Sequence, residues 1–188
     1  MVRPGELIFY SKRDANTFFD QLRASRELQS FFGRPTVEAS ELAAELGLDV
    51  EALGEYLGDG ADLRLVAASI LTHVSAVWPL GFAWISCVAQ ATRVALCLAS
   101  GLGADQLLCL ERRHPVGDDE VATVVTDDVI FMHRSRAAAA SRLTDFDVAM
   151  ATHDAQANTD KSVDCAEAIV ALGCALSNCP GRAEPDGD

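Results

Sequence analysis

The sequence lacks the short motifs by which many enzymes are recognised. It contains no GxGxxG or GxxxxGK[ST] phosphate-binding loop, no HExxH metal-binding helix and no GxSxG nucleophile turn. Its six cysteines include no CxxC pair, the spacing that zinc sites and redox centres commonly use. These absences favour a protein without catalysis, cofactor or metal of its own.

Positive charge is also scarce. The 188 residues include 15 lysines and arginines against 28 acidic residues, which gives a formal net charge of −13. Residues 35–62 contain acidic residues but no lysine or arginine. Part of this stretch, ELAAELGLDVEAL, is similar to a DNA-binding helix-turn-helix, but its charge would repel phosphates. The charge argues against nucleic acid and anionic membranes and favours a basic protein partner.

Charge of either sign is missing from residues 65–92, which raises the question of a membrane span. Pro79, scattered serines and threonines, and the lack of a flanking basic cluster favour two buried helices that break at residues 78–81. The N-terminal apolar run is too short for a signal peptide. The six cysteines are therefore expected to be free thiols in a reducing cytoplasm.

The first part of the chain has two segments with helical periodicity. Apolar residues between 18 and 32 recur at spacings of three and four, and Gly33 and Pro35 end the run. Leucines between 42 and 57 form a second apolar face, which Gly47 interrupts. The pattern predicts an N-terminal helical hairpin module.

Short β-branched or apolar runs follow at residues 107–110, 121–125 and 129–132, with acidic residues at the breaks, and they predict a small antiparallel strand meander. Residues 135–142 are predicted as a short helix or a basic linker and mark a domain boundary. The acidic C-terminal segment that follows is either a tail or a helix over residues 166–176. We predict a mostly α fold of the α+β class: the hairpin module, a buried apolar helix pair, the meander, and a C-terminal helix or tail. The predicted domains are residues 1–60, 61–134 and 135–188.

The segment FFDQLRASRELQSFF, followed by SELAAELGLDVEAL, resembles the Nif11-type leader domain. That family joins a Phe-Leu-x-x-Leu … x-Glu-Leu helix to an Ala-x-x-x-Gly-[Leu/Phe]-Asp segment. The matching positions are Phe18, Phe19, Leu22, Glu27, Leu28, Leu42, Ala43, Gly47 and Asp49. The resemblance implies a leader region of a ribosomally made peptide, recognised by a modifying enzyme and ended by a processing site similar to LGDGA at residues 57–61. The apolar helix faces that would bind this partner carry Phe18, Phe19, Leu22, Leu28, Leu42 and Leu46.

The C-terminal segment fits the substrate part of such a precursor. The residues DFDV at 145–148 resemble the Phe-Asn/Asp-Leu-Asp box of lanthipeptide leaders, although the third box residue is absent. Elimination of a hydroxyl and addition of a thiol to the alkene would form a thioether ring between Ser162 and Cys165. The modification candidates are Ser162, Cys165, Cys174, Ser177 and Cys179. Core positions on a C-terminal helix are the alternative explanation for Cys165 and Cys174.

The preferred hypothesis is a precursor or substrate protein of a post-translationally modified peptide pathway, whose N-terminal module docks onto a modifying enzyme. A small helical protein-binding or regulatory protein without catalysis is the alternative. The third hypothesis is a small enzyme subunit that uses Cys109, His114 or His133, although their irregular spacing is not typical of a metal site. The first two hypotheses imply a cytoplasmic protein with a protein partner, and no nucleic acid, membrane or cofactor.

Overall fold

The computed structural model describes residues 6–57, 65–109, 119–178 and 184–185. It divides the chain into two compact units. Unit 1 combines Met1–Leu22 with Leu80–Asp188, and unit 2 is Arg23–Pro79. Unit 2 is therefore an insertion in the sequence of unit 1.

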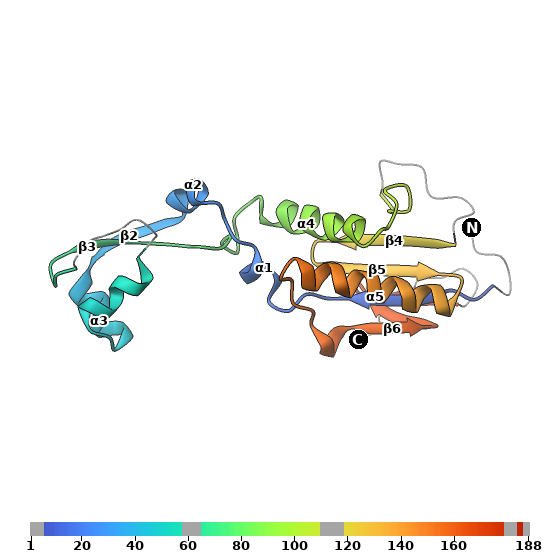
Figure 1. Ribbon diagram of the computed structural model, residues 1–188. Helices are drawn as coiled ribbons and strands as arrows, with labels where there is room; N and C mark the ends of the chain where they lie inside the picture. The colour runs from blue at the N-terminus through green and yellow to red at the C-terminus, as the bar shows by residue number, and fades with distance from the viewer. Residues whose placement is uncertain (1–5, 58–64, 110–118, 179–183, 186–188) are drawn as a thin grey trace. The chain divides into compact units, whose positions relative to one another are not determined.

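Unit 1 is built on a four-stranded antiparallel sheet with the strand order β4-β5-β1-β6 (Figure 1). A helix follows the first strand along the chain, and another joins the third strand to the fourth. This βαββαβ order, with its first and third strands at the centre, is the split βαβ or ferredoxin-like arrangement. The elements are β1 (Phe9–Arg13), α1 (Phe18–Gln21), α4 (Ile85–Ala99), β4 (Glu120–Val125), β5 (Asp128–His133), α5 (Arg136–Thr152), η3 (Thr159–Lys161) and β6 (Val163–Ala166).

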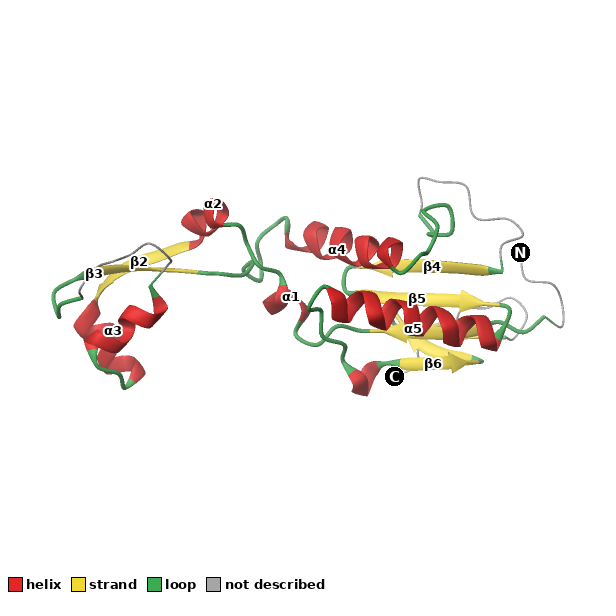
Figure 2. Ribbon diagram, in the orientation of Figure 1, coloured by secondary structure: helices red, strands yellow, loops and turns green. Residues whose placement is uncertain are grey.

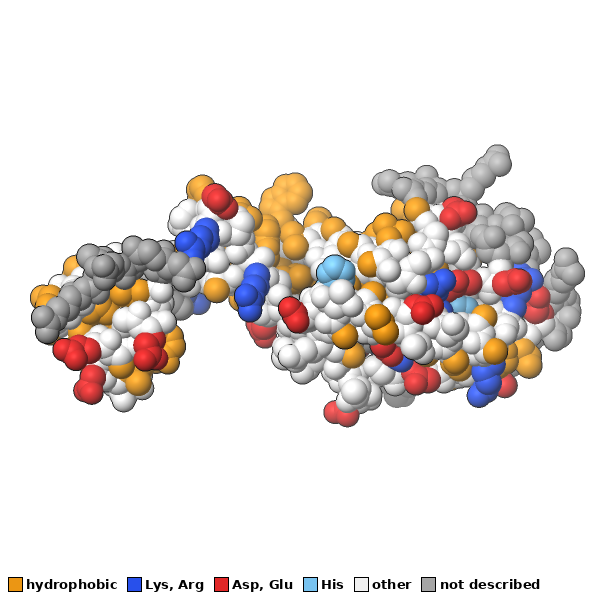
Figure 3. Space-filling model, in the orientation of Figure 1, with side chains coloured by type: hydrophobic (Ala, Val, Ile, Leu, Met, Phe, Trp, Pro, Cys, Tyr) orange, Lys and Arg blue, Asp and Glu red, His pale blue; other side chains and the backbone are white. Residues whose placement is uncertain are grey.

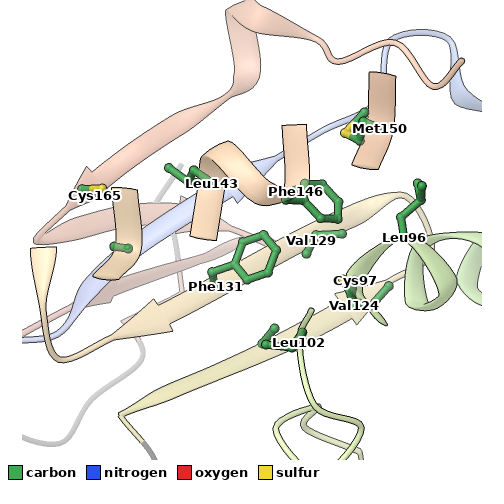
Figure 4. Packing of buried hydrophobic residues seen from close by; sticks show 12 residues of the cluster. Leu96, Cys97, Leu102, Val124, Val129, Phe131, Leu143, Phe146, Met150 and Cys165 are labelled. Carbon is green, nitrogen blue, oxygen red and sulfur yellow. The ribbon is translucent and has the colours of Figure 1, made fainter. Parts of the chain in front are cut away.

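Helices α4 and α5 pack on one face of this sheet (Figure 2). Side chains alternate between the two faces of a strand, so Val129 and Phe131 point to the same side. Their cross-strand partners, which lie on β4, are Val124 and Ala122. The ring of Phe131 meets the ring of Phe146 from α5 edge-on, with 5.2 Å between the ring centroids (Figure 4). This face is the main hydrophobic core of unit 1.

The opposite face of the sheet is covered by a β-hairpin. Strands β7 (Ala168–Ala171) and β8 (Cys174–Ser177) pair in antiparallel register, and β9 (Glu184–Pro185) pairs with β8. Leu172 and Gly173 connect β7 to β8 with φ angles of 55° and 71°, as a two-residue type I′ turn requires. Ile169 of β7 packs against Ile130 of the central sheet. Both faces of the sheet are thus protected from water.

Unit 2 has a much smaller core. Its elements are α2 (Arg26–Gln29), η1 (Ser30–Phe32), β2 (Gly33–Glu38), α3 (Ala39–Leu46), η2 (Val50–Tyr56) and β3 (Ile70–Val74). Strands β2 and β3 form a two-stranded antiparallel ribbon. Helix α3 ends at Gly47, which adopts the left-handed conformation with φ of 67°. The buried side chains between α3, η2 and the ribbon are Ala39, Ala43, Leu53 and Leu65.

The prediction of a mostly α fold with an N-terminal helical hairpin is wrong. The structure is 39% helix and 28% strand, and belongs to the α+β class with three antiparallel sheets. Residues 18–32 form two single-turn helices and a 3-10 turn instead of one amphipathic helix. The chain leaves the helical conformation at Leu22 because the backbone of Ala24 donates a hydrogen bond to Ala76, 3.0 Å away. A long-range pairing thus replaces the helical hydrogen bonds that the periodicity predicts.

Two further parts of the predicted fold need correction. The expected pair of apolar helices is one strand, β3, and one helix, α4. The expected C-terminal helix at residues 166–176 is the β7–β8 hairpin, in which exposed and buried residues alternate along β7. The predicted meander is partly right, because β4 and β5 coincide with two of its three runs. In the third run, Leu107 makes a single parallel bridge to Ala122.

Candidate functional site

The structure separates the six residues expected to bind a partner. Phe18 and Leu22 belong to unit 1, where they are 4% and 7% exposed. Phe19, Leu28 and Leu42 are half-buried, and Leu42 packs against the core of unit 2. Leu46, at the end of α3, is 56% exposed. Phe18 and Leu22 are therefore not accessible to a partner, and Leu46 alone among the six is well exposed.

Phe18 is buried because it covers an arginine inside unit 1. The guanidinium carbon of Arg93 lies 5.0 Å from the centroid of the Phe18 ring and 5.8 Å from that of Phe146. Arg93 is fully buried and donates hydrogen bonds to the backbone oxygens of Asp127 and Arg13. Burial lowers the pKa of Arg93. Phe18 thus stabilises the interior of unit 1.

Large apolar side chains are exposed in unit 2 at a higher density than in unit 1. Fifteen of them are well exposed in the described chain, and six of these lie in unit 2, which is under a third of the sequence. The six are Phe31 (80%), Leu46 (56%), Tyr56 (74%), Val66 (59%), Ile70 (62%) and Val74 (38%). We call these six residues the apolar surface of unit 2. They are spread over η1, α3, η2, β3 and the loop at Val66, so it is their number in unit 2, and not any one of them, that makes this unit a candidate for binding another protein.

Exposed acidic side chains are a second feature of unit 2, and most of them lie on α3 and the segment after it. Figure 3 shows red and orange side chains next to one another around the position that α3 has in Figure 1. Six acids of β2, α3 and the segment after α3 are exposed, and none of them forms an ion pair with a residue that the structure describes. They are Glu38, Glu41, Glu45, Asp49, Glu51 and Glu55. With no lysine or arginine between residues 35 and 57, they create a negative potential that would attract a basic partner.

The candidate residues for modification are held in folded elements of unit 1. Ser162 is half-buried and donates a hydrogen bond to the backbone oxygen of Asn158 at 2.8 Å. Cys165 is 8% exposed, and its backbone N–H donates to the hydroxyl of Ser11 at 3.1 Å. Cys174 and Ser177 are half-buried in β8, and Cys179 lies outside the described residues. A modifying enzyme would need to open β6 to reach Cys165.

The hypothetical Cys/His site is not assembled from residues that the structure describes. Cys109 is exposed, His133 is 1% exposed, and His114 lies outside the described ranges. No group of three or more His, Cys, Asp or Glu side chains in the described ranges is arranged to hold a metal ion.

A buried polar cluster joins β4, β5 and α5, and no motif in the sequence indicates it. Both oxygens of Glu120 accept hydrogen bonds from Arg142, at 2.5 and 2.9 Å. His133 Nε2 lies 3.5 Å from Glu120, and neither ring nitrogen has a hydrogen-bond partner among the described residues. Burial lowers the pKa of His133, although Glu120 opposes this effect. The cluster fastens α5 to the sheet.

A second polar cluster lies at the other end of α5, beside a cavity of about 460 Å³. Arg13 is 6% exposed and donates to both carboxylate oxygens of Asp147, at 2.8 and 2.9 Å, and to Asp164 at 2.5 Å. Burial alone would lower the pKa of Arg13, but the hydrogen bonds with Asp147 and Asp164 raise it. Because two carboxylates occupy the guanidinium, it is not available to bind an anion in the cavity.

Comparison with known proteins gives no family for this chain: no protein-family model matches it, and no curated protein is significantly similar to it. The resemblance to the Nif11-type leader domain stays a prediction from the residues. Within the described ranges, no helix is long and apolar enough to cross a membrane.

Proposed function

We propose that this protein is a non-catalytic binding protein, in which the apolar surface of unit 2 docks onto another protein. The observation that carries the proposal is the combination, in unit 2, of exposed apolar side chains with exposed acidic side chains over residues 38–55, a stretch that has no lysine or arginine. The partner would present apolar side chains flanked by lysine or arginine. Unit 1 would act as the stable body from which unit 2 is presented.

The enzyme-subunit hypothesis receives less support from the site. In each of the two polar clusters of unit 1 an arginine is held by carboxylates within the fold, and the His133 side chain of the first cluster is 1% exposed. Neither cluster contains an exposed nucleophile beside a base, which covalent catalysis would need. The docking proposal requires no such arrangement.

The precursor hypothesis and the docking proposal share the same first step, since a modifying enzyme is one class of partner. They differ in what happens to the C-terminal segment. Modification of Cys165 would first require that β6 leave the central sheet, because its backbone and side chain are buried there. The proposal therefore assigns binding to unit 2 and leaves the segment at residues 162–178 as part of the fold.

A cytoplasmic location is part of the proposal. The cysteines that the structure describes, Cys87, Cys97, Cys109, Cys165 and Cys174, are free thiols. Free thiols are common in a reducing compartment.

Site-specific photocrosslinking in the native host tests the proposal. Tyr56 is replaced by the photoreactive analogue p-benzoylphenylalanine, which keeps an aromatic ring at an exposed position beside Glu55. The matched control places the same group at Val148, which is 60% exposed on α5 of unit 1. We expect position 56 to give a discrete protein adduct that position 148 does not give. The peptide of the partner that is crosslinked to position 56 is expected to carry apolar and basic residues. No adduct, or the same adducts from both positions, would overturn the proposal.

A further inference from the structure

Along the outer edges of the β2–β3 ribbon, backbone groups of both strands are not paired with any residue that the structure describes. Across the ribbon Glu38 faces Ile70, Val37 faces Leu71 and Thr36 faces Thr72. The backbone N–H of Ala39 donates a hydrogen bond to the backbone oxygen of Ser69 at 2.8 Å. Ala39 and Ser69 are therefore a hydrogen-bonded pair, and they lie next to the pair of Glu38 and Ile70. Bonded and non-bonded pairs alternate in an antiparallel ladder. Leu71 is therefore bonded to β2, whereas the N–H and C=O groups of Ile70 and Thr72 point away from β2.

The two edges of the ribbon differ in how they are protected. Strand β2 contains Arg34, Pro35 and Glu38, and a charge or a proline on an edge strand discourages further pairing. Strand β3, with the sequence ILTHV, contains neither, and its residues are mostly β-branched. Among the described residues β3 pairs with β2 alone. No residue that the structure describes pairs with the outer edge of β3, and its sequence does not discourage an added strand as that of β2 does.

The exposed face of β3 supplies side-chain contacts for such a strand. Ile70, Thr72 and Val74 lie on one face and are exposed, while Leu71 on the other face packs against the core of unit 2. Glu38 lies on the exposed face directly across from Ile70. An added strand would place apolar side chains beside Ile70 and Val74, and basic side chains would be attracted by the acids of unit 2.

We propose that β3 binds an extended segment of the partner protein as a third, antiparallel or parallel strand, and that this segment alternates apolar residues with lysine or arginine. This inference rests on the proposed docking function and gives its binding mode. Backbone hydrogen bonds would supply affinity, and the alternating side chains would supply specificity. A second copy of this chain is a poorer occupant, because it would bring two acidic surfaces together.

The experiment uses the full-length protein and a peptide of about ten residues that alternates valine and lysine, a length that covers a typical strand. Amide hydrogen exchange is measured by NMR with and without the peptide. We expect slower exchange at Ile70 and Thr72 on binding, no such change at Thr36, and no binding of a peptide in which glutamate replaces lysine. Slower exchange at Thr36 instead of Thr72, or no saturable binding at millimolar peptide, would overturn the strand-addition proposal.

Two matched proline variants sharpen the test. Thr72→Pro removes an outward N–H from β3, and Thr36→Pro removes the corresponding N–H from β2; neither touches the bonds between the strands. We expect Thr72→Pro to weaken peptide binding about tenfold and Thr36→Pro to leave it nearly unchanged. Retained slow exchange at Leu71 checks that the ribbon still forms.

If the partner that is crosslinked from position 56 binds the Thr72→Pro variant normally, the docking proposal stands and the strand-addition proposal is wrong. Self-association of the chain that Thr72→Pro abolishes would identify a second copy as the occupant and overturn the proposal.

Discussion

The two units differ in how completely they bury their apolar residues. Unit 1 covers both faces of its sheet, with α4 and α5 on one side and the β7–β8 hairpin on the other. Among the described residues, unit 2 buries five apolar side chains, three of them alanines, and leaves six large ones exposed. A two-stranded ribbon with so small a core is of marginal stability alone. The comparison indicates that unit 1 is the more stable unit and that unit 2 exposes a larger share of its large apolar residues.

The largest expected effect is on the core of unit 1. Phe131→Ala removes a fully buried ring that packs against Phe146, and leaves a cavity between the sheet and α5. We expect a loss of about 4 kcal/mol in the free energy of unfolding. Urea titration followed by circular dichroism measures it. Val125→Ala, at an exposed position of β4, is the control and is expected to change stability by less than about 0.5 kcal/mol.

A smaller and more local effect is expected in unit 2. Leu53 is 2% exposed in a core of four buried side chains, so Leu53→Ala removes a large part of it, at a cost of about 3 kcal/mol. We expect α3 and β3 to lose protection from amide hydrogen exchange while β5 keeps it. Leu46→Ala, at the exposed end of α3, is the matched control. Equal loss of protection in β5 would show that the two units unfold together and would break the comparison.

The parts of the fold that could be predicted are those with strong local signals. The runs that became β4 and β5 are β-branched and separated by acidic turn residues, and both strands formed. For residues 166–176 the pattern predicts either a helix or a tail, and Ile169, Val170 and Leu172 are compatible with a helical or a strand period. Packing of Ile169 on the central sheet, far away in sequence, decides in favour of a strand.

The candidate site divides in a similar way. Its acidic charge could be read from the composition of residues 35–62, because acidic side chains remain at the surface in most folds. The exposed apolar residues of the site could not be identified from the sequence, because the helical periodicity places Phe18 and Phe31 equally on the apolar face. The insertion of unit 2 after α1 decides between them: Phe18 covers Arg93 in unit 1, and Phe31 lies exposed in unit 2. No local pattern reveals where an inserted unit begins.

The smallest predicted effect is a pH dependence that belongs to unit 1. Burial lowers the pKa of His133 below its ordinary value of 6.5, so the folded state resists protonation there. Above pH 6.5 the residue is neutral in both the folded and unfolded states, and its contribution to stability is complete. As the pH falls below 6.5, the unfolded state takes up a proton first, and stability declines until the pH reaches the folded-state pKa.

The slope of this decline cannot exceed about 1.4 kcal/mol per pH unit for one group. Urea titrations at several pH values, with hydrogen exchange at β5 and α3 as local probes, measure it for each unit. His133→Phe keeps a ring beside Phe131, which lies 6.4 Å from it between centroids, and removes the titration. We expect this variant to flatten the pH dependence of β5 and to leave that of α3 unchanged. An unchanged slope at β5 would mean that groups other than His133 control the acid sensitivity of unit 1. The buried cluster of Glu120, His133 and Arg142 would then not be the reason that the two units respond differently to pH.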